Sequence, residues 1–351
     1  MNERIKKNYK EYYEIIEVIG IGGYGCVYKG RDKNTKEMRA IKVISIEKIR
    51  GNLTFKYEIE ENLLYEYEAS EIEKQKNLFI NGFIEEFNNM KICSNNNKNS
   101  VKCYEYFNNE NNFVIIMELC DNNLLQILNK RIKEKGKVFN IEEIYDIMIQ
   151  LNNTFKIMKE NNIIYRDLKL ENILIKYIDK EKYIIKLSDY GCSKRLISLS
   201  RNCNTYSGTL LYMSPEILKG EEYNYKCDLW SIGIIIFTLI YCISPYIGDK
   251  DIELINKIDN LGNKIIKIEN EELNDLVKSL LEKDPEKRIN WDEYFKHPFF
   301  KTKNVINIIY YVKKDEEKEQ NIFGRKFVEN NENKIELVIN GVNYKLVENL
   351  T

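Results

Sequence analysis

A short polar cluster between two apolar segments is the feature that most constrains this chain. It consists of Arg166, Asp167, Lys169, Glu171 and Asn172. Isoleucine and leucine flank it on both sides, at residues 163–164 and 173–175. Two short buried strands would hold these charged groups at one fixed place, as a functional site requires. The alternative at this point is an ordinary polar turn between two strands.

The composition excludes several classes of protein. The chain has 351 residues, 43% of them hydrophobic, which is enough for a sizeable core. Its 54 basic and 55 acidic side chains balance, so we expect no bulk attraction to nucleic acid or to a membrane. The 8 cysteines form no C-x-x-C pair and the chain has 1 histidine, which argues against a zinc site. The most apolar run, Ile232–Ile243, is too short to span a bilayer. No leader segment opens the chain, so we expect a cytoplasmic protein with reduced thiols.

A glycine-rich segment near the N-terminus follows a stretch, Tyr13–Gly20, that is typical of a β-strand. Gly20, Gly22 and Gly25 form G-x-G-x-x-G, and Val27 follows. This pattern also occurs in dinucleotide-binding units, where a helix comes straight after the glycines. Here a strand pattern continues from Val27, so the sequence predicts strand–loop–strand. The backbone of such a loop can cover phosphate groups because glycine has no side chain to block them.

Further motifs follow in the order and at the spacing of the eukaryotic protein kinases of serine/threonine type, a family that the chain resembles over residues 13–300. They are Arg39-Ala40-Ile41-Lys42 for V-A-I-K, Tyr165-Arg166-Asp167-Leu168 with Asn172 for H-R-D-L-x-x-x-N, Ser188-Asp189-Tyr190-Gly191 for D-F-G, Ser214-Pro215-Glu216 for A-P-E, and Asp228 at the start of an apolar helix. The departures are tyrosine for histidine, tyrosine for phenylalanine, serine for alanine, and a long acidic insert. Order and spacing together exclude coincidence.

The resemblance implies an α+β fold with two lobes, a small antiparallel β lobe with its αC helix and a large, mainly helical lobe, with ATP in the cleft between them. The expected parts are an N-terminal arm (1–12), a protein kinase domain (13–300) with its N-lobe (13–119), acidic insert (46–82) and C-lobe (120–300), and a small β-rich C-terminal extension (301–351). The αC helix is expected at Leu78–Cys93, and the insert before it is expected to be partly helical. Apolar spacing predicts a further helix over 141–160, and Asp121 is expected to cap the helix before it.

The same resemblance implies catalytic and metal-binding roles. Asp167 would accept or orient the proton of the substrate hydroxyl, and Lys169 would lie near the transferring phosphoryl group. Lys42 would contact the α- and β-phosphates of ATP. Asn172 and Asp189 would hold Mg²⁺, or Mn²⁺, through oxygen ligands.

The nucleotide-binding residues that the resemblance implies lie on the glycine loop, the following strand, the αC helix, the hinge and the strand after the catalytic loop. They are Ile19, Gly20, Gly22, Gly23, Gly25, Val27, Ala40, Lys42, Glu86, Met117, Glu118, Cys120 and Leu174. Met117 is the expected gatekeeper, and Glu118-Leu119-Cys120 the hinge whose backbone would hydrogen-bond adenine. Glu86, with an apolar residue four positions later, is the expected partner of Lys42, and Glu85 is the alternative.

Regulation is expected in the segment Cys192–Ser207, which would form the activation loop. Thr205 lies three residues before Gly208, where many kinases are phosphorylated, and Arg166 would pair with the phosphate. The competing acceptors are Ser200, Tyr206 and Ser207. An unmodified polar loop is the alternative.

Other features are expected to be structural. Asp228 would accept hydrogen bonds from the catalytic-loop backbone, and Arg288 would form a buried bidentate pair with Glu216. The single histidine, His297, lies far from the motifs and is expected to pack. A spine that links the lobes is expected from Met90, Cys103, Tyr165 and Tyr190.

Residues 301–351 lie outside the resemblance. Val305–Val312 is expected to be a strand. Ile335–Ile339, Asn340-Gly341 and Val342–Val347 predict a hairpin, since Asn-Gly favours a type I′ turn. Because a lone hairpin is marginally stable, we expect a small β module that docks on the kinase or recruits a partner.

The expected function is that of an ATP-dependent serine/threonine protein kinase, which transfers the γ-phosphoryl group of ATP-Mg to Ser/Thr hydroxyls of protein substrates and is activated by an upstream kinase. Lys169 and Thr209 favour Ser/Thr over Tyr. The alternative from another class is a pseudokinase, an ATP-binding scaffold, but such proteins usually lack one of the lysine, aspartate and asparagine groups, all of which are present here. A kinase for a small molecule or lipid would need a different cleft from the peptide platform that Ser214-Pro215-Glu216 implies.

Overall fold

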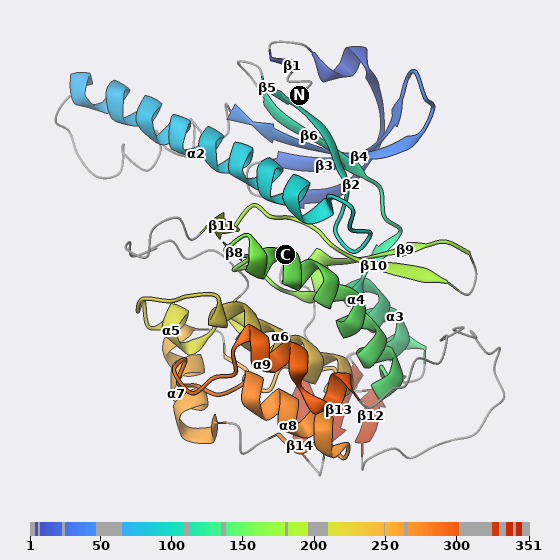
Figure 1. Cartoon of the computed structure of the whole chain (residues 1–351), viewed down its shortest axis with the longest axis vertical. Helices are drawn as coiled ribbons and strands as arrows, with labels where there is room; N and C mark the ends of the chain where they lie inside the picture. Colours follow the sequence, from blue (N-terminus) through green and yellow to red (C-terminus); the bar gives the residue numbers. More distant parts are fainter. Residues whose placement is uncertain are drawn as a thin grey trace.

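The chain folds into two lobes (Figure 1). Residues 165–172, which resemble the kinase catalytic loop, are called here the catalytic segment. The computed structural model describes residues 4–5, 8–22, 25–46, 65–108, 112–134, 138–179, 182–195, 210–248, 250–262, 266–301, 325–329, 335–339 and 342–345. The small lobe holds a β-sheet and one long helix, and the large lobe is mainly helical. The expected α+β, two-lobed fold is confirmed.

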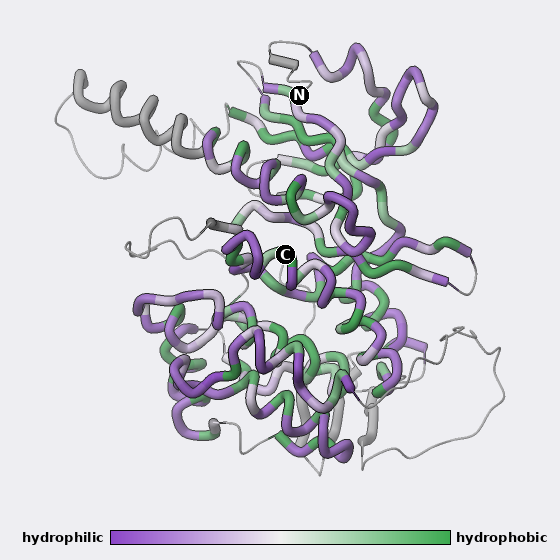
Figure 2. Tube along the Cα trace, viewed as in Figure 1, coloured by the Kyte–Doolittle hydropathy of each residue, from purple (hydrophilic) through white to green (hydrophobic). Residues whose placement is uncertain are grey.

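The sheet of the small lobe has six strands in the order β1-β5-β6-β4-β3-β2. Their bounds are β1 Arg4–Ile5, β2 Tyr13–Gly22, β3 Gly25–Asp32, β4 Met38–Ser45, β5 Cys103–Asn108 and β6 Asn112–Glu118. Strands β2 to β6 pair antiparallel, as predicted, and β1 runs parallel to β5. Figure 2 shows apolar residues along the central strands, where both faces of the sheet are covered.

The N-terminal segment covers one face of this sheet. A short 3₁₀ helix, η1 (Tyr9–Glu11), brings Tyr9 and Tyr13 against Phe107 and Ile116. Both tyrosines are buried, and their rings enlarge the apolar area removed from water on that face. The chain from Asn8 onward therefore belongs to the lobe and is not the separate arm expected of residues 1–12.

The other face of the sheet packs against α2 (Tyr65–Ser94), a helix of 30 residues. The expected αC helix, Leu78–Cys93, forms its second half, and its first half belongs to the insert, which was expected to be partly helical. Residues 65–81 contain neither glycine nor proline, so nothing in this charged stretch breaks the helix. The first part of the expected insert, residues 47–64, lies outside the described residues.

The large lobe begins with the short strand β7, which pairs antiparallel with β9. Its elements are β7 Asn122–Asn123, α3 Leu124–Lys133, α4 Ile141–Glu160, β8 Ile163–Ile164, η2 Leu170–Asn172, β9 Ile173–Tyr177, β10 Tyr183–Leu187, β11 Lys194–Arg195, η3 Leu210–Tyr212, α5 Pro215–Leu218, α6 Lys226–Tyr241, α7 Asp251–Leu261, α8 Glu271–Leu280, α9 Trp291–Lys296 and η5 Pro298–Phe300. Helix α4 matches the predicted bounds. The cap predicted for α3 was wrong, because β7 pairs with β9 and keeps the chain extended, so Asn123 caps the helix instead of Asp121.

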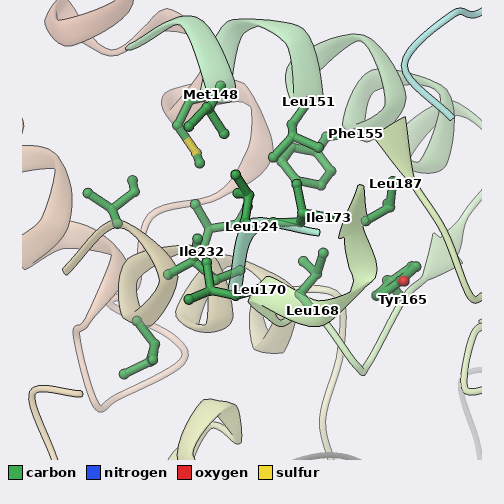
Figure 3. Close-up of a cluster of buried hydrophobic side chains, with 14 of the residues drawn as sticks. Leu124, Met148, Leu151, Phe155, Tyr165, Leu168, Leu170, Ile173, Leu187 and Ile232 are labelled. Atoms are coloured by element: carbon green, nitrogen blue, oxygen red, sulfur yellow. The ribbon is translucent and has the colours of Figure 1, made fainter. Parts of the chain in front are cut away.

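The catalytic segment is anchored in the core of the large lobe. Leu168 and Leu170 point into an apolar cluster with Leu151 and Phe155 of α4 and Ile232 of α6 (Figure 3). Helix α6 is buried along most of its length, which explains its apolar sequence. Alternate residues of the segment are thereby fixed, and the polar residues between them are left facing the other way.

An asparagine-rich loop between α2 and β5 of the small lobe contacts the large lobe. Asn99, fully buried, donates to the backbone oxygen of Ile185 (2.9 Å) and to the side chain of Gln150 (3.1 Å). Thr154 of α4 donates to the backbone oxygen of Asn99 (2.8 Å). The loop after α2 is thus bound to the large lobe by directional hydrogen bonds, and the asparagines supply both donors and acceptors.

The C-terminal extension forms a sheet of three antiparallel strands, β12 (Arg325–Glu329), β13 (Ile335–Ile339) and β14 (Val342–Lys345). The predicted hairpin is present as β13 and β14, with its Asn340-Gly341 turn outside the described residues. Strand β12 was not predicted, and Val305–Val312 also lies outside them. Within the described ranges, no helix combines the length and hydropathy needed to cross a membrane.

Candidate active site

One lysine of the small lobe bridges two carboxylates. Lys42 Nζ on β4 lies 2.6 Å from Glu86 Oε1 on α2 and 3.0 Å from Asp189 Oδ1, which follows β10. Lys42 faces the helix because its neighbour Ile41 points to the opposite, buried face of the sheet. Glu86, and not Glu85, is therefore the partner of Lys42.

The charges of this trio depend on one another. Burial opposes the charge on Lys42, but Asp189 and Glu86 outweigh it and raise the pKa of Lys42 above its ordinary value. The charge of Lys42 lowers the pKa of Asp189, so that carboxylate stays ionised. Burial raises the pKa of Glu86 to about 7, against the opposing effect of Lys42. The site thus combines a cation of the small lobe, Lys42, with an ionised carboxylate of the large lobe, Asp189.

The catalytic segment forms a second polar cluster. Lys169 Nζ lies 2.8 Å from Asp167 Oδ2, and Asn172 Nδ2 donates to the same oxygen (3.1 Å) and to the backbone oxygen of Asp167 (2.9 Å). The turn η2 brings Asn172 back to Asp167. Burial raises the pKa of Asp167, and the charge of Lys169 opposes that effect. A half-buried carboxylate next to a lysine is suited to accept a proton.

A buried aspartate of α6, Asp228, holds the backbone of the catalytic segment by hydrogen bonds. The carboxylate of Asp228, at the start of α6, accepts hydrogen bonds from the backbone N–H groups of Tyr165 and Arg166, both at 2.8 Å. This contact was predicted and is confirmed. Burial raises the pKa of Asp228 to about 6, although the two N–H groups favour its charged form. The bonds hold Arg166 at φ 70°, a strained conformation that only surrounding contacts can maintain.

The predicted spine is present as a buried stack. Met90, Cys103, Tyr165 and Tyr190 all belong to one core, and the two tyrosine rings meet edge to face with centroids 5.3 Å apart. Tyr165 donates its hydroxyl to the backbone oxygen of Ser188, and the hydroxyl of Tyr190 is 2.8 Å from Ser100 Oγ. Tyr165 stands where the family pattern has histidine and Tyr190 where it has phenylalanine, and both hydroxyls have hydrogen-bond partners. Ser100 was not singled out from the sequence.

The glycine segment lies where β2 ends and β3 begins. Strands β2 and β3 pair as far as Gly22 and Gly25, so the connection between them is two residues, Gly23 and Tyr24, which lie outside the described residues. A Cβ at Gly25 would lie 2.0 Å from the backbone oxygen of Val43. The sheet itself therefore requires glycine at 25. Ile19 and Gly20 lie on β2 and Val27 on β3, where it pairs with Lys42.

The expected hinge follows β6. Ala40 pairs with Met117, and Leu174 of β9 is half-buried across the junction of the lobes. The Glu118 carboxylate accepts from Lys176 Nζ (2.6 Å) and forms an ion pair with Lys186 Nζ (3.0 Å). These lysines lower the pKa of Glu118 although burial opposes them. The side chain of Glu118 is thus engaged by the two lysines, and its backbone N–H donates to the backbone oxygen of Lys102 (2.8 Å). The two lysines were missed from the sequence because their partner lies on another lobe.

The remaining predicted residues fall into two groups. Arg288 donates to both oxygens of Glu216 at 2.7 and 2.9 Å, which confirms the predicted bidentate pair. His297 caps η5 and lies 3.1 Å from Asp275 Oδ2, far from the site, as predicted. The competing acceptors Ser200, Tyr206 and Ser207, together with Thr205, Gly208 and Thr209, lie outside the described residues.

Comparison with known proteins agrees with this geometry. The family model described as "Protein kinase domain" matches residues 65–300. Calcium-dependent protein kinase 3 of Plasmodium berghei is 32% identical over 306 residues, which are 84% of this chain and 48% of that protein. Serine/threonine-protein kinase atg1 of Dictyostelium discoideum is 30% identical over 295 residues (83% and 40%), and serine/threonine-protein kinase Nek11 of Macaca fascicularis is 28% identical over 295 residues (82% and 40%).

The fold and the paired clusters define the two-lobed architecture of a protein kinase domain. The chain belongs to the protein kinase family. It spans about half the length of the curated relatives it matches. The family match begins after the glycine segment and Lys42, so the identification of those residues rests on their geometry in the small lobe.

Proposed function

We propose that this chain is an ATP-dependent serine/threonine protein kinase that phosphorylates Ser/Thr hydroxyls of protein substrates. The observation that carries the proposal is the completeness of the two clusters. Lys42 is paired with Glu86 and Asp189, and Asp167 is held with Lys169 and Asn172. Because every charged group that phosphoryl transfer requires is present and oriented, positioning and charge neutralisation are both supported.

The residues fit a magnesium ion by their chemistry. Asp189 offers a carboxylate that Lys42 keeps ionised, and Asn172 offers an amide oxygen. Ser188, next to Asp189, donates its N–H to the backbone oxygen of Asn172 (3.0 Å), which keeps the two ligand positions adjacent. Hard oxygen donors with few protein ligands suit Mg²⁺, and Mn²⁺ is a second candidate. When bound, ATP-Mg supplies the phosphoryl group and neutralises its charge.

Each residue then has a defined task. Lys42 holds the α- and β-phosphates, and the backbone of the glycine segment covers them. The hinge backbone from Glu118 to Cys120 binds adenine. Asp167 orients the substrate hydroxyl and takes its proton, while Lys169 offsets charge on the γ-phosphoryl group. The anchoring of Glu216 by Arg288 supports a rigid platform for a peptide substrate.

Control by phosphorylation of Thr205 is part of the proposal. The guanidinium group of Arg166 donates to the backbone oxygen of Cys192 and to the hydroxyl of Tyr223 (3.0 Å), so it lies beside the first residue of the activation loop. A phosphate offers stronger, charge-assisted acceptors to the same group. An upstream kinase is the partner that this control requires. Thr205→Ala is expected to lower activity, and mass spectrometry of the active protein would locate the phosphate.

The alternative function is an ATP-binding scaffold. A direct test incubates the chain with radiolabelled ATP-Mg and a panel of basic and acidic proteins, followed by phosphoamino-acid analysis. Asp167→Asn should lower kcat by roughly 10²–10⁴-fold with ATP still bound, and Asp189→Asn should weaken binding of ATP-Mg. Asp292→Asn, at an exposed pair with Lys159, is the matched control.

Label on Ser/Thr that disappears in Asp167→Asn and Asp189→Asn, but not in the control, supports the kinase. Nucleotide binding without any transfer, before and after treatment with upstream kinases, would favour the scaffold.

A further inference from the structure

Helix α2 contacts the segment after β10 at a second point beyond the Lys42–Glu86 pair. Asn89, three residues after Glu86 on the same helix face, donates from Nδ2 to Ser193 Oγ at 2.9 Å. Ser193 in turn donates its hydroxyl (2.6 Å) and its N–H (2.9 Å) to the backbone oxygen of Tyr190. The helix is therefore bound to the turn that directly follows Asp189.

The amide of Asn89 has an energetic cost that packing does not explain. Its side chain is fully buried, and Oδ1 has no hydrogen-bond partner among the residues that the structure describes. An apolar side chain of the same shape would fill this place without a buried, unpaired oxygen. Among the residues that the structure describes, the interaction that requires an amide here is the hydrogen bond to Ser193.

The segment between these contacts is strained. Asp189 has φ 50°, in the left-handed region, which costs free energy and persists only where neighbouring contacts hold it. A Cβ at Gly191 would lie 3.2 Å from both Asp189 Oδ1 and Glu86 Oε2, so the turn runs close to the two carboxylates. The hydrogen bonds of Ser193 restrain the C-terminal side of this turn. The bond of Ser188 to Asn172 restrains its N-terminal side.

We propose that Asn89 and Ser193 form a positioning pair that places the carboxylate of Asp189 and couples it to the orientation of α2. One flexible contact, Lys42–Glu86, allows the helix to rotate about its axis. Two contacts on one face, three residues apart, fix that rotation. The inference rests on the proposed role of Asp189 as a magnesium ligand, because its consequence is a lower affinity for nucleotide in the presence of the metal.

The test uses Asn89→Leu and Ser193→Ala in the full chain, with Asn152→Leu as the matched control. Asn152 on α4 is also a buried asparagine whose Oδ1 has no partner among the described residues. ADP affinity is measured by calorimetry with and without Mg²⁺. In both variants of the pair, the gain in affinity that Mg²⁺ gives is expected to fall about tenfold, the factor that one hydrogen bond supplies. Affinity without metal and the behaviour of Asn152→Leu should remain those of wild type.

Three further readouts separate positioning from structural support. The thermal midpoint of Asn89→Leu should equal or exceed that of wild type, because a buried unpaired oxygen is removed. The double variant should lose no more than Ser193→Ala alone, because that variant already removes the bond to Asn89 together with the hydroxyl bond to Tyr190. Hydrogen exchange of a peptide covering 188–195 in the ligand-free protein should be faster in Asn89→Leu than in Asn152→Leu.

The outcomes are distinguishable. Faster exchange in Asn89→Leu supports the pair whether or not Mg²⁺ raises the ADP affinity of wild type. If Mg²⁺ has no effect on that affinity in wild type, this second result counts against the proposed kinase function and not against the pair. Unchanged exchange together with an unchanged effect of Mg²⁺ in both variants would overturn the pair and leave the kinase proposal intact.

Discussion

Glu216→Gln should be among the most destabilising isosteric changes in the large lobe. Arg288 is fully buried, and its guanidinium group donates to both oxygens of Glu216 at 2.7 and 2.9 Å, with its centre 5.2 Å from the Trp230 ring. Glutamine keeps the shape but removes the charge and turns one acceptor into a donor. The remaining acceptors of Arg288 are neutral backbone oxygens of Glu282, Lys226 and Lys283.

The expected loss is about 3–5 kcal/mol of the free energy of unfolding, because an uncompensated cation stays buried. Both tryptophans of the chain, Trp230 and Trp291, lie in the large lobe, so their fluorescence reports its unfolding directly. The thermal midpoint should fall by roughly 6–20 °C, at about 2–4 °C per kcal/mol for a lobe of this size. Asp292→Asn, which breaks an exposed pair, should cost less than about 1 kcal/mol.

Removing both charges of the pair is expected to have a smaller effect than removing one. Replacing both partners, Glu216→Leu with Arg288→Met, removes the buried charges together and should be more stable than Glu216→Gln alone. A loss below about 1 kcal/mol for Glu216→Gln, equal to that of the control, would refute the claim that solvent does not screen this buried ion pair.

Three further predictions follow from the site. Gly25→Ala should weaken nucleotide binding and destabilise the small lobe, since its Cβ would lie 2.0 Å from a backbone oxygen of β4, whereas Gly82→Ala on α2, with open space around it, should stabilise by about 0.5–1 kcal/mol. The pKa of Glu86, raised to about 7 from 4.5, predicts that the transfer rate falls from pH 8 to 6, with no such inflection in Glu86→Gln; stability has the opposite sign, present below 4.5 and lost as pH rises through 7. Asp228→Asn should cost about 1–3 kcal/mol in urea unfolding, because one of two buried N–H groups loses its acceptor.

The motifs could be predicted from the sequence because each one joins a local pattern to a fixed separation along the chain. Gly25 marks a strand turn, and Asp189 ends a buried strand 22 residues after Asp167. Such patterns were enough to predict the two lobes, the cluster around Asp167 and the partner of Lys42. The Glu86 choice succeeded because helical spacing toward an apolar residue is itself local information.

The contacts that the sequence did not predict join segments far apart in the chain. Lys186 pairs with Glu118, and Asn89 bonds to Ser193, and each of these contacts joins the small lobe to the large lobe. Tyr9 reads as part of a polar arm, yet it packs on a face of the sheet whose exposure no local pattern reports. The insert was expected to be partly helical, but the sequence did not predict that its helical part and the αC helix form one continuous helix, α2.

The two tyrosines of the site show how a departure from a family pattern becomes part of its mechanics. A buried hydroxyl requires a partner, and Tyr190 finds one in Ser100, itself fully buried in the loop after α2. Phenylalanine would pack at 190 but would leave the serine hydroxyl unpaired, so the two residues form one feature. Tyr165 adds a second directional bond, to the backbone of Ser188. The segment before and after Asp189 is thus bound to both lobes by hydrogen bonds, whose geometry fixes rotation as well as distance. The placement of the proposed metal ligand in this chain therefore depends on polar contacts that an apolar spine does not provide.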